Sequence, residues 1–416
     1  ICLVVAAFLD ITAGTFGIND GDPQISAAAG TASMLFIILA LLFGFMVYRK
    51  GAGVLVSTIV GVVLLAIVIF ISDKYPFLQL NKFPWQVILT IYIICASLMP
   101  VWILLQPRDY LSSFLLYAMV IGGVVGLVVG RPAMAAPMFT SINPSAGNYL
   151  FPILFITVAC GAISGFHALV SSGTSAKQLN SEKDAKLVGY GAMLIEGVVA
   201  IIALMSVAAV AGNTDGSPAQ KFAVGVSTFM NSFGIPMGIG RTFVTLAFAS
   251  FALTSLDSAT RIGRYLVQEL GEYTSSDGRV HKTFLTNPYI ATAITVGVSL
   301  MFTFYGYGRI WPIFGSANQL LAGLSLLAVA AWIKNRQKRT SWETIIPLVF
   351  MFIVTLSALG LVVYNNIAKH TFDGYVLAVI AAVMIILAVV ELFITGQWAR
   401  GLKDSVADPN ETVRNK

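Results

Sequence analysis

Charged side chains are scarce in this sequence, and their scarcity limits the classes of protein to which it can belong. Asp, Glu, Lys and Arg make up 11% of the 416 residues, whereas hydrophobic residues make up 57%. A soluble domain carries about 25% charged residues. So little charge cannot cover the surface of a water-soluble protein of this length. The composition is that of a polytopic membrane protein.

Cysteine is also rare, and the signatures of several enzyme classes are missing. Cys2, Cys95 and Cys160 fall in apolar stretches, and an odd number without metal-ligand spacing predicts neither a disulfide framework nor a zinc site. The sequence contains no G-x-x-x-x-G-K-[ST], H-E-x-x-H or G-x-S-x-G motif. We therefore predict a protein that is not an enzyme and needs no cofactor or metal. Without a nucleotide-binding motif, we do not expect this chain to be an ATP-driven pump on its own.

Long apolar runs dominate what is present. Twelve of them approach the length of about 20 residues that a helix needs to cross a bilayer. They are too long and too uniformly apolar for a transmembrane β-barrel, whose strands run about 9–11 residues. We predict an all-α, polytopic helical membrane protein. The predicted spans are 1–17, 31–48, 53–72, 86–105, 111–130, 149–171, 187–211, 242–266, 288–306, 311–332, 343–364 and 375–396.

The basic residues predict the orientation of the bundle. Most of the 25 lysines and arginines lie in alternate loops between the predicted spans, and loops of this kind are cytoplasmic in membrane proteins. This bias predicts a cytoplasmic C-terminus. It also accounts for the net charge of +6 without any affinity for nucleic acid. We predict one transmembrane domain over residues 1–402 and a polar cytoplasmic tail over 403–416.

Three further segments carry expectations of their own. The sequence begins at Ile1 inside an apolar run and without a basic flank, so we expect N-terminal helices to precede it. Residues 219–236 are apolar at helical spacing but short, which favours an interfacial or re-entrant helix over another crossing. Residues 131–148 contain three prolines and are expected to form an external loop.

The densest polar cluster inside an apolar run lies at residues 159–174. Ser164, His167 and Ser171 are spaced i, i+3 and i+7, so on a helix they would share one face. Nearby glycines make a helix easy to break, and loosened backbone inside a bilayer is tolerated only beside protein or water. We predict a substrate-facing break; the alternative is glycines that pack helices and hydroxyls that bond their own backbone. The predicted substrate-binding residues here are Ser164, His167, Ser171, Ser172, Gly173 and Thr174.

Glu196 and Asp10 are two of the carboxylates that lie inside predicted spans. Glu196 lies about 14 Å into its span at a rise of about 1.5 Å per residue, which is close to the middle of the bilayer. A charge at that depth is costly, so Glu196 must be protonated, paired or hydrated. A proton or cation site and a structural hydrogen bond are equally favoured there. Asp10 is a further candidate for ion coupling, although the nearby helix end favours a structural role.

A second dense cluster covers residues 251–269. Asp257 and Arg261 are spaced i, i+4 and can pair on one helix face. Thr254 and Ser258 add hydroxyls beside the carboxylate. An anchor at the cytoplasmic end of the span would explain Arg261, but it would not explain Asp257. We therefore favour an ion-coupling or gating site formed by Asp257, Thr254 and Ser258.

Two adjacent carboxamides, Asn318 and Gln319, lie within the predicted span 311–332. Amides inside a bilayer need partners, which are either groups on a neighbouring helix or a bound ligand. Both readings stay open, and we include Asn318 among the predicted substrate-binding residues. The motif at 107–110, Pro-Arg-Asp-Tyr, joins two predicted spans and is interpreted as a tight structural hairpin.

Five motifs together resemble the carbon starvation protein CstA family, in order along nearly the whole chain. They are MPVWILLQPRDYLSSFLL, CGAISGFHALVSSGTSAKQL, GYGAMLIEGVVAIIAL, ALTSLDSATRIGRYLVQE and IFGSANQLLAGLSLL. The resemblance implies an inverted-repeat transporter fold with broken helices in a bacterial plasma (inner) membrane. It also implies uptake of peptides or of pyruvate, the latter with protons, in the response to nutrient starvation.

The sequence departs from the family pattern near the predicted site. Gly197 follows Glu196 where the family often has Ser, and residues 174–176 read Thr-Ser-Ala in place of the usual Thr-Thr-Pro. The family also has an upstream broken helix and an acidic helix that this sequence does not include. These departures bear on the identity of the substrate.

Three functional hypotheses follow. The first is a proton-coupled carrier for pyruvate or another small carboxylate, and the second is a peptide carrier on the same scaffold. The third is a membrane receptor or sensor for such a ligand, which is disfavoured because no predicted loop is long enough to hold an output domain. The expected partners are a small-molecule substrate, the lipid bilayer and a coupling ion, which we expect to be a proton. The sequence leaves sodium coupling and the oligomeric state open.

Overall fold

The computed structural model describes residues 1–19, 22–51, 53–139, 141–143, 149–161, 163–211, 217–274 and 280–399. The predicted tail at 403–416 and part of the predicted loop at 131–148 lie outside these ranges. The chain divides into two compact units. Unit 1 comprises Ile1–Met138 and Tyr190–Ile310, and unit 2 comprises Phe139–Gly189 and Trp311–Lys416.

Helices of transmembrane length account for most of the described chain, which confirms the all-α polytopic fold. Eight of the described helices are long and apolar enough to cross a membrane, and three shorter helices are also apolar. Together they occupy every predicted span except the sixth. The long helices are α2 (Pro23–Gly44), α3 (Val54–Lys74), α5 (Leu105–Gly130), α9 (Ala192–Ala209, with the turns from Asp184 before it), α11 (Met237–Leu270), α13 (Tyr307–Gln337), α14 (Trp342–Ile367) and α15 (Phe372–Ala399); the short ones are α1 (Cys2–Phe16), α4 (Lys82–Leu98) and α12 (Pro288–Thr303).

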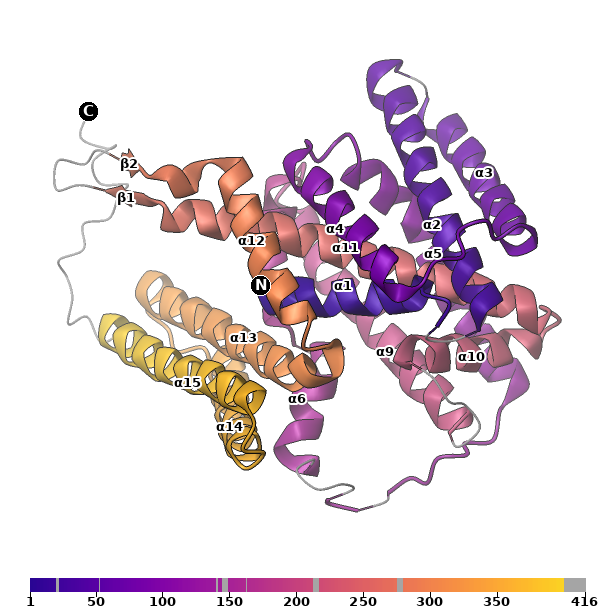
Figure 1. Cartoon of the computed structure of the whole chain (residues 1–416). Coiled ribbons are helices and arrows are strands. Elements are labelled where there is room, and N and C mark those ends of the chain that lie inside the picture. Colours follow the sequence, from indigo (N-terminus) through magenta and orange to yellow (C-terminus); the bar gives the residue numbers. More distant parts are fainter. Residues whose placement is uncertain are drawn as a thin grey trace. The chain divides into compact units, whose positions relative to one another are not determined.

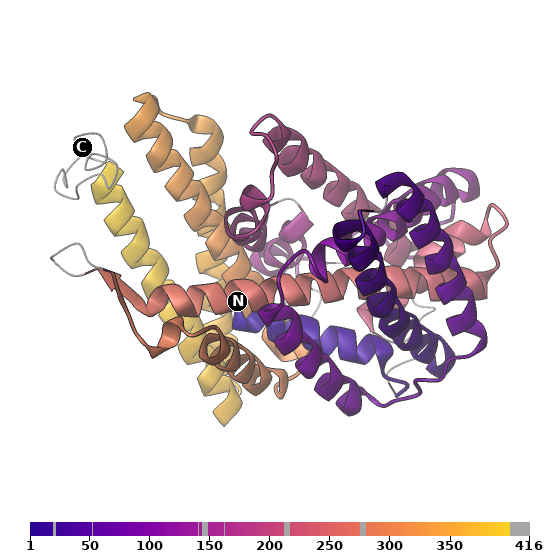
Figure 2. The ribbon, with the colours of Figure 1, turned by 90° about the horizontal axis from the view of Figure 1, so that it is seen from above.

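Unit 1 is organised around α11. This long salmon-coloured helix contacts α1, α2, α4, α5, α10 and α12 (Figures 1 and 2). Its apolar window is 61% buried inside the protein, compared with 17% for α3. The difference follows from composition, because α11 carries Asp257, Arg261 and Arg264 and must hide them, whereas a helix that is apolar all round can face lipid.

The segment predicted as an interfacial or re-entrant helix forms α10 (Pro218–Asn231). Ser217 and Gln220 close a capping box at its start, in which each side chain accepts a hydrogen bond from the other's backbone N–H. Its 14 residues are too few to span a bilayer. Phe222, Val226 and Phe229 are buried where α10 packs on α5, α9 and α11.

Unit 2 contains the sixth predicted span, and this span is broken. An irregular turn (Leu150–Leu154), α6 (Phe155–Val158) and a 3-10 turn (Ala159–Gly161) precede α7 (Gly165–Gly173). The other helices of the unit are α13, α14 and α15; α14 packs on α15 and on α6. The predicted interruption is therefore present in the fold.

The chain after α11 forms a small antiparallel hairpin that the sequence analysis missed. Strand β1 (Glu272–Thr274) pairs with β2 (Val280–Lys282) (Figure 1). In this pairing Tyr273 lies opposite His281. The aromatic rings of this pair stack with centroids 5.2 Å apart. An Asp-Gly dipeptide at 277–278 is the sequence signal that could have indicated a hairpin.

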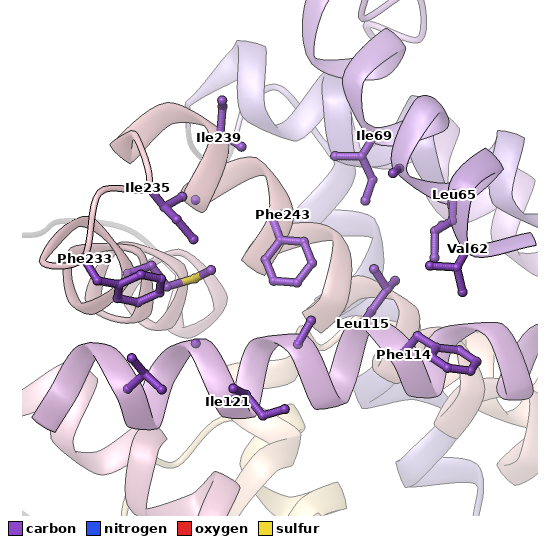
Figure 3. Close-up of a pocket in the computed structure, with 16 residues that line it drawn as sticks. Val62, Leu65, Ile69, Phe114, Leu115, Ile121, Phe233, Ile235, Ile239 and Phe243 are labelled. Carbon is purple, nitrogen blue, oxygen red and sulfur yellow. The ribbon is translucent and has the colours of Figure 1, made fainter. Parts of the chain in front are cut away.

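A cavity of about 570 Å³ in unit 1 is lined by apolar residues. Side chains from α3, α5 and α11 point toward it, together with Phe233 and Ile235 from the turn before α11 (Figure 3). Substrate sites orient their ligand with a few placed polar groups. This cavity has none in its lining, so it does not qualify as the site for a carboxylate or a peptide.

A close helix contact within unit 1 supplies a test of the packing. A Cβ added at Gly225 of α10 would lie 2.4 Å from the carbonyl oxygen of Ser206 on α9. Gly225→Ala must therefore push the two helices apart, and we expect it to lower the free energy of unfolding by about 1–3 kcal/mol. Thermal unfolding of the detergent-solubilised protein measures the effect.

Gly197→Ala is the matched control on α9, because a Cβ there meets no atom within 4 Å. Removing this helical glycine should leave stability unchanged or raise it by up to about 1 kcal/mol. Equal melting temperatures for the Gly225→Ala variant and the unsubstituted protein would contradict the close approach of α9 and α10.

Candidate functional site

The break in unit 2 includes Ile163 and Ser164, which directly precede α7 and belong to no helix. Ser164 has an extended backbone (φ −136°, ψ 126°), and α7 begins at Gly165. The first N–H groups of a helix have no partner within it. Here the acceptor comes from another helix, because the Asn318 side-chain oxygen accepts the N–H of Phe166 at 2.7 Å. The N-cap residue of α7 is Ser164, and Asn318 of α13 supplies the capping hydrogen bond that Ser164 does not make.

Asn318 and Gln319 hold both sides of the break. Asn318 Nδ2 lies 3.2 Å from Ser164 Oγ and 3.5 Å from Cys160 Sγ. In the amide orientation that satisfies both neighbours, Gln319 donates to the carbonyl of Ile163 at 2.8 Å and accepts from the N–H of Cys160 at 3.2 Å. Both carboxamides are buried. Their partners are therefore groups of the neighbouring segment, as one of the two readings of this pair expected.

Glycine makes this contact possible. A Cβ at Gly165 would lie 2.3 Å from the carbonyl oxygen of Asn318 and 2.5 Å from the backbone nitrogen of Ala322. Any larger residue would push α7 away from α13 and lengthen the bond from Asn318 to Phe166. Gly165 is thus needed for close approach of two backbones, which is a common role of glycine between membrane helices.

The predicted shared face of Ser164, His167 and Ser171 needs a correction. Ser164 precedes α7, so it has no helical relation to the other two residues. His167 and Ser171 are exposed on α7, and the rings of His167 and Phe166 are in edge contact. The hydroxyls of Ser172 and Thr174 donate to backbone carbonyls three and four residues earlier, which is the alternative that the sequence left open.

The second cluster lies in unit 1, and here the predicted partner was wrong. Asp257 of α11 pairs with Arg108 of α5 and not with Arg261. Arg108 Nη1 donates to Asp257 Oδ2 and to the hydroxyl of Tyr92, and that hydroxyl donates to Asp257 Oδ2 at 2.8 Å. Both charged side chains are about 1% exposed. This buried network joins α4, α5 and α11.

Thr254 and Asp109 extend the network toward the surface. Arg108 Nη2 lies 2.9 Å from Asp109 Oδ1 and 3.2 Å from Thr254 Oγ1. The Thr254 hydroxyl lies 3.1 Å from the same carboxylate oxygen of Asp109. The structure therefore brings the predicted residue Thr254 to Asp257 through Arg108. Ser258 is half-buried on the same helix.

Arg108 escaped the sequence analysis because its motif was interpreted as a hairpin. The structure corrects this, since Leu105 begins α5 and Pro107 and Arg108 lie in its first turn. Proline is tolerated there because the first N–H groups of a helix lack partners. Arg108 is thus a buried helical residue and not a loop residue. The sequence signal for this position was Pro107, because a proline is common in the first turn of a helix and so indicates that Arg108 belongs to the helix and not to a loop.

Arg261 has a different role. Its Nη2 donates to the backbone carbonyls of Ala96 at 2.6 Å and Met99 at 2.7 Å. These carbonyls belong to the last turn of α4 and to its C-cap residue, where carbonyls have no partner within the helix. A guanidinium at this position also complements the negative end of the helix dipole. Arg261 therefore caps α4.

The remaining predicted coupling residues lie elsewhere in unit 1. Asp10 is 2% exposed and bonds Lys82 Nζ at 3.0 Å and Gln86 Nε2 at 3.0 Å, so it belongs to a cluster between α1 and α4. Glu196 is half-buried on α9, a helix that packs against α5 and α10. The three carboxylates predicted to couple ions, Asp10, Glu196 and Asp257, therefore lie on three different helices.

These features define a class: a multi-pass helical membrane protein with an interrupted helix and a buried ion-pair network. The sequence pattern of the family described as "Carbon starvation protein CstA" matches residues 1–215 and 209–358. The chain belongs to the carbon starvation protein CstA family.

Relatives of two described activities match the chain. It is 34% identical to the peptide transporter CstA of Escherichia coli K12, over 63% of this chain and 47% of the relative. It is 32% identical to the peptide transporter CstA of Campylobacter jejuni, over 77% of this chain and 56% of the relative. It is 31% identical to the pyruvate/proton symporter BtsT of E. coli K12, over 79% and 58%. The chain spans about half the length of these relatives.

The role of Asn318 as a cap supplied by another helix can be tested by Asn318→Leu. The substitution keeps the approximate volume and removes the acceptor of the Phe166 N–H, at a cost of about 1–3 kcal/mol to the start of α7. Hydrogen exchange at the first residues of α7 should quicken by about tenfold or more. Ser325→Ala on the same helix is the control, since that hydroxyl bonds its own backbone. Unchanged exchange in Asn318→Leu would contradict the capping role.

Proposed function

We propose that the protein is a secondary active transporter in a bacterial plasma (inner) membrane, with a cytoplasmic C-terminus. It takes up pyruvate or a similar small carboxylate, or peptides, coupled to protons, in the response to nutrient starvation. The observation that carries this proposal is the interrupted helix ending at α7, in a chain of this family. Non-helical backbone at membrane depth is tolerated only inside protein or beside a water-filled cavity.

The interrupted helix supports a substrate site because its polar groups are gathered on one short stretch. In transporters with broken helices, the exposed backbone and the half-helix ends bind substrate and ions. We propose that Ser164, Asn318 and the exposed His167 form the substrate-facing side, continued by residues 171–174. Asn318 and Gln319 form hydrogen bonds with backbone groups on both sides of the break, and these bonds stabilise the interrupted conformation.

The Arg108–Asp257 network supports the coupling site. In the part of the chain that the structure describes, the second oxygen of Asp257, Oδ1, is buried and lacks a hydrogen-bond partner. A proton added to this carboxylate would remove its charge and weaken its attraction to Arg108. Arg108 would keep its bonds to Asp109 and Thr254. Thr254 is on α11, so its bond with Arg108 would still join α5 to α11, and protonation would weaken the contact of α11 with α4 and α5 without breaking it. A contact whose strength depends on one proton is the kind of element that coupling needs.

Other polar residues remain candidates for the coupling ion. We propose three of them as secondary candidates for binding the coupling ion, because of their expected depth in the bilayer or their neighbours in the sequence: Glu196, Ser258 and Asp10. Asp257 is preferred because it forms an ion pair with a buried arginine, Arg108. The pyruvate/proton symporter among the relatives favours a proton over sodium.

Counterflow in proteoliposomes tests the transport function. Vesicles loaded with unlabelled pyruvate should accumulate labelled pyruvate transiently if pyruvate is the substrate, and vesicles loaded with a dipeptide should do so with labelled dipeptide. Competition by short monocarboxylates and by dipeptides separates the two substrate classes. A receptor or sensor would bind the ligand without counterflow, and that result would overturn the proposal.

Asp257→Asn tests the coupling site, because asparagine mimics the permanently protonated carboxyl. We expect counterflow to persist while accumulation driven by a pH gradient is lost. Asp73→Asn is the control: that carboxylate also bonds α11, through Thr242 at 2.7 Å, but it is not part of the network. Uptake is measured with and without an imposed pH gradient.

A second variant guards against a folding defect. Asp257→Asn leaves Arg108 without its buried partner, and breaking a buried pair costs about 3–5 kcal/mol. The double variant Arg108→Gln with Asp257→Asn removes both charges and should restore folding but not coupling. Retained dependence on the pH gradient in either folded variant would exclude Asp257 as the coupling group.

A further inference from the structure

The apolar cavity of unit 1 lies among membrane-spanning helices. Most of its lining comes from α3, α5 and α11, and each of these helices is long and apolar enough to cross a bilayer. Leu65, Leu115 and Met230 are buried and form its inner wall, whereas Ile121 and Ile239 in the same lining are 62% and 52% exposed. The cavity is therefore a pocket with a buried inner wall and an edge that is open to the surroundings of the helices.

Hydrocarbon is the content that suits this cavity. A buried water needs about two to four polar partners, and the lining residues are apolar. An empty cavity forfeits the dispersion contacts of its walls, at a cost that grows with its volume. Apolar cavities of about 150 Å³ already bind a molecule of benzene, and this one has about 570 Å³. We therefore expect an apolar molecule to fill it.

The length of the lining matches one leaflet of a bilayer. On α5 the lining runs from Phe114 to Val125, which is about 16 Å at a rise of about 1.5 Å per residue. One leaflet contributes half of a hydrocarbon core that is about 30 Å thick. Val125 and Ile69 lie close to the last residues of their helices, Gly130 of α5 and Lys74 of α3. A chain in the cavity would thus extend from the membrane surface toward its middle.

A hydrogen bond joins α3 to α11 at the surface end of the cavity. The Thr242 hydroxyl donates to Asp73 Oδ1 at 2.7 Å, one turn of α3 beyond the lining residue Ile69. The next residue of α11, Phe243, points into the space between α3 and α5 (Figure 3). The two helices are thus joined near the surface and separated by the cavity deeper in the membrane. This geometry suits a molecule whose polar end stays at the surface while its apolar chain lies between the helices.

We propose that an acyl chain of a bilayer phospholipid occupies this cavity and that it is bound by its shape and length. Lipid tails are as apolar as leucine, so the chain gains nothing by leaving water. It binds because it restores the dispersion contacts that the walls would otherwise lack. None of the lining residues that the structure describes carries a polar side chain. The head group is therefore not distinguished, and a short chain leaves the inner end of the cavity unfilled.

Native mass spectrometry of the delipidated protein tests this proposal. The protein is purified in a steroid-based detergent without an alkyl chain and is then incubated with lipids of different chain length. We expect dipalmitoyl phosphatidylcholine to bind about tenfold more tightly than dihexanoyl phosphatidylcholine, because the affinity falls with the volume left unfilled. Dipalmitoyl phosphatidylglycerol should bind as tightly as dipalmitoyl phosphatidylcholine, because the cavity contacts only the chain.

Two substitutions on different walls assign the binding to this cavity. Ala118→Phe on α5 and Ala66→Leu on α3 each place a larger side chain in the lining. We expect each to weaken the binding of the dipalmitoyl lipid about tenfold. Each should also raise the melting temperature of the lipid-free protein by filling the cavity, which a folding defect would not do. Val124→Phe is the control, because Val124 is exposed on α5 and lies outside the lining.

The proposal fails if the dihexanoyl lipid binds as tightly as the dipalmitoyl lipid, or if phosphatidylglycerol is strongly preferred to phosphatidylcholine of the same chain length. It also fails if either folded filling variant retains the full affinity, or if Val124→Phe lowers the affinity as much as they do. Because no transport is measured, each of these outcomes leaves the proposed transport function unaffected.

Discussion

The buried pair of Arg108 and Asp257 is the interaction on which unit 1 depends. It joins α5 to α11, and Tyr92 brings α4 into the same network. Removing two charges from water is expensive, and their attraction offsets that cost only when the remaining donors and acceptors are also satisfied. Asp109 and Thr254 supply such partners for the guanidinium. Burial of this pair in turn requires α11 to sit inside the unit, with more apolar helices such as α3 outside it.

The same constraint explains the buried polar residues outside this ion pair. In a chain with 11% charged residues, backbone groups released from a helix inside the bilayer must find partners within the protein. Arg261 satisfies the open carbonyls at the end of α4. Asn318 and Gln319 satisfy the groups freed by the interruption before α7. One helix end and one helix break are thus stabilised by side chains from other helices.

Local patterns predicted the elements, but partners distant in sequence could not be read from them. The composition indicated helical spans, and the glycines around Ser164 indicated the break. Asp257 was predicted to belong to an ion-coupling or gating site, yet its partner was sought four residues away, whereas Arg108 lies 149 positions earlier. The spacing rule for a helix face says nothing about other helices. The pairing of Asn318 with Phe166 escaped prediction for the same reason, since their contact depends on how α13 packs against α7.

The two polar sites differ in how readily they can change. At the break, the neutral side chains of Asn318 and Gln319 bond backbone N–H and C=O groups. None of these groups changes its charge with pH, so this arrangement favours a single conformation. At Arg108, by contrast, the attraction to Asp257 depends on a charge that one proton can remove, while Asp109 remains as an alternative partner. A bistable element needs such a pair of competing arrangements of similar energy. This difference is the physical reason for our proposal that the interrupted helix contacts the substrate and that the buried ion pair couples transport to protons.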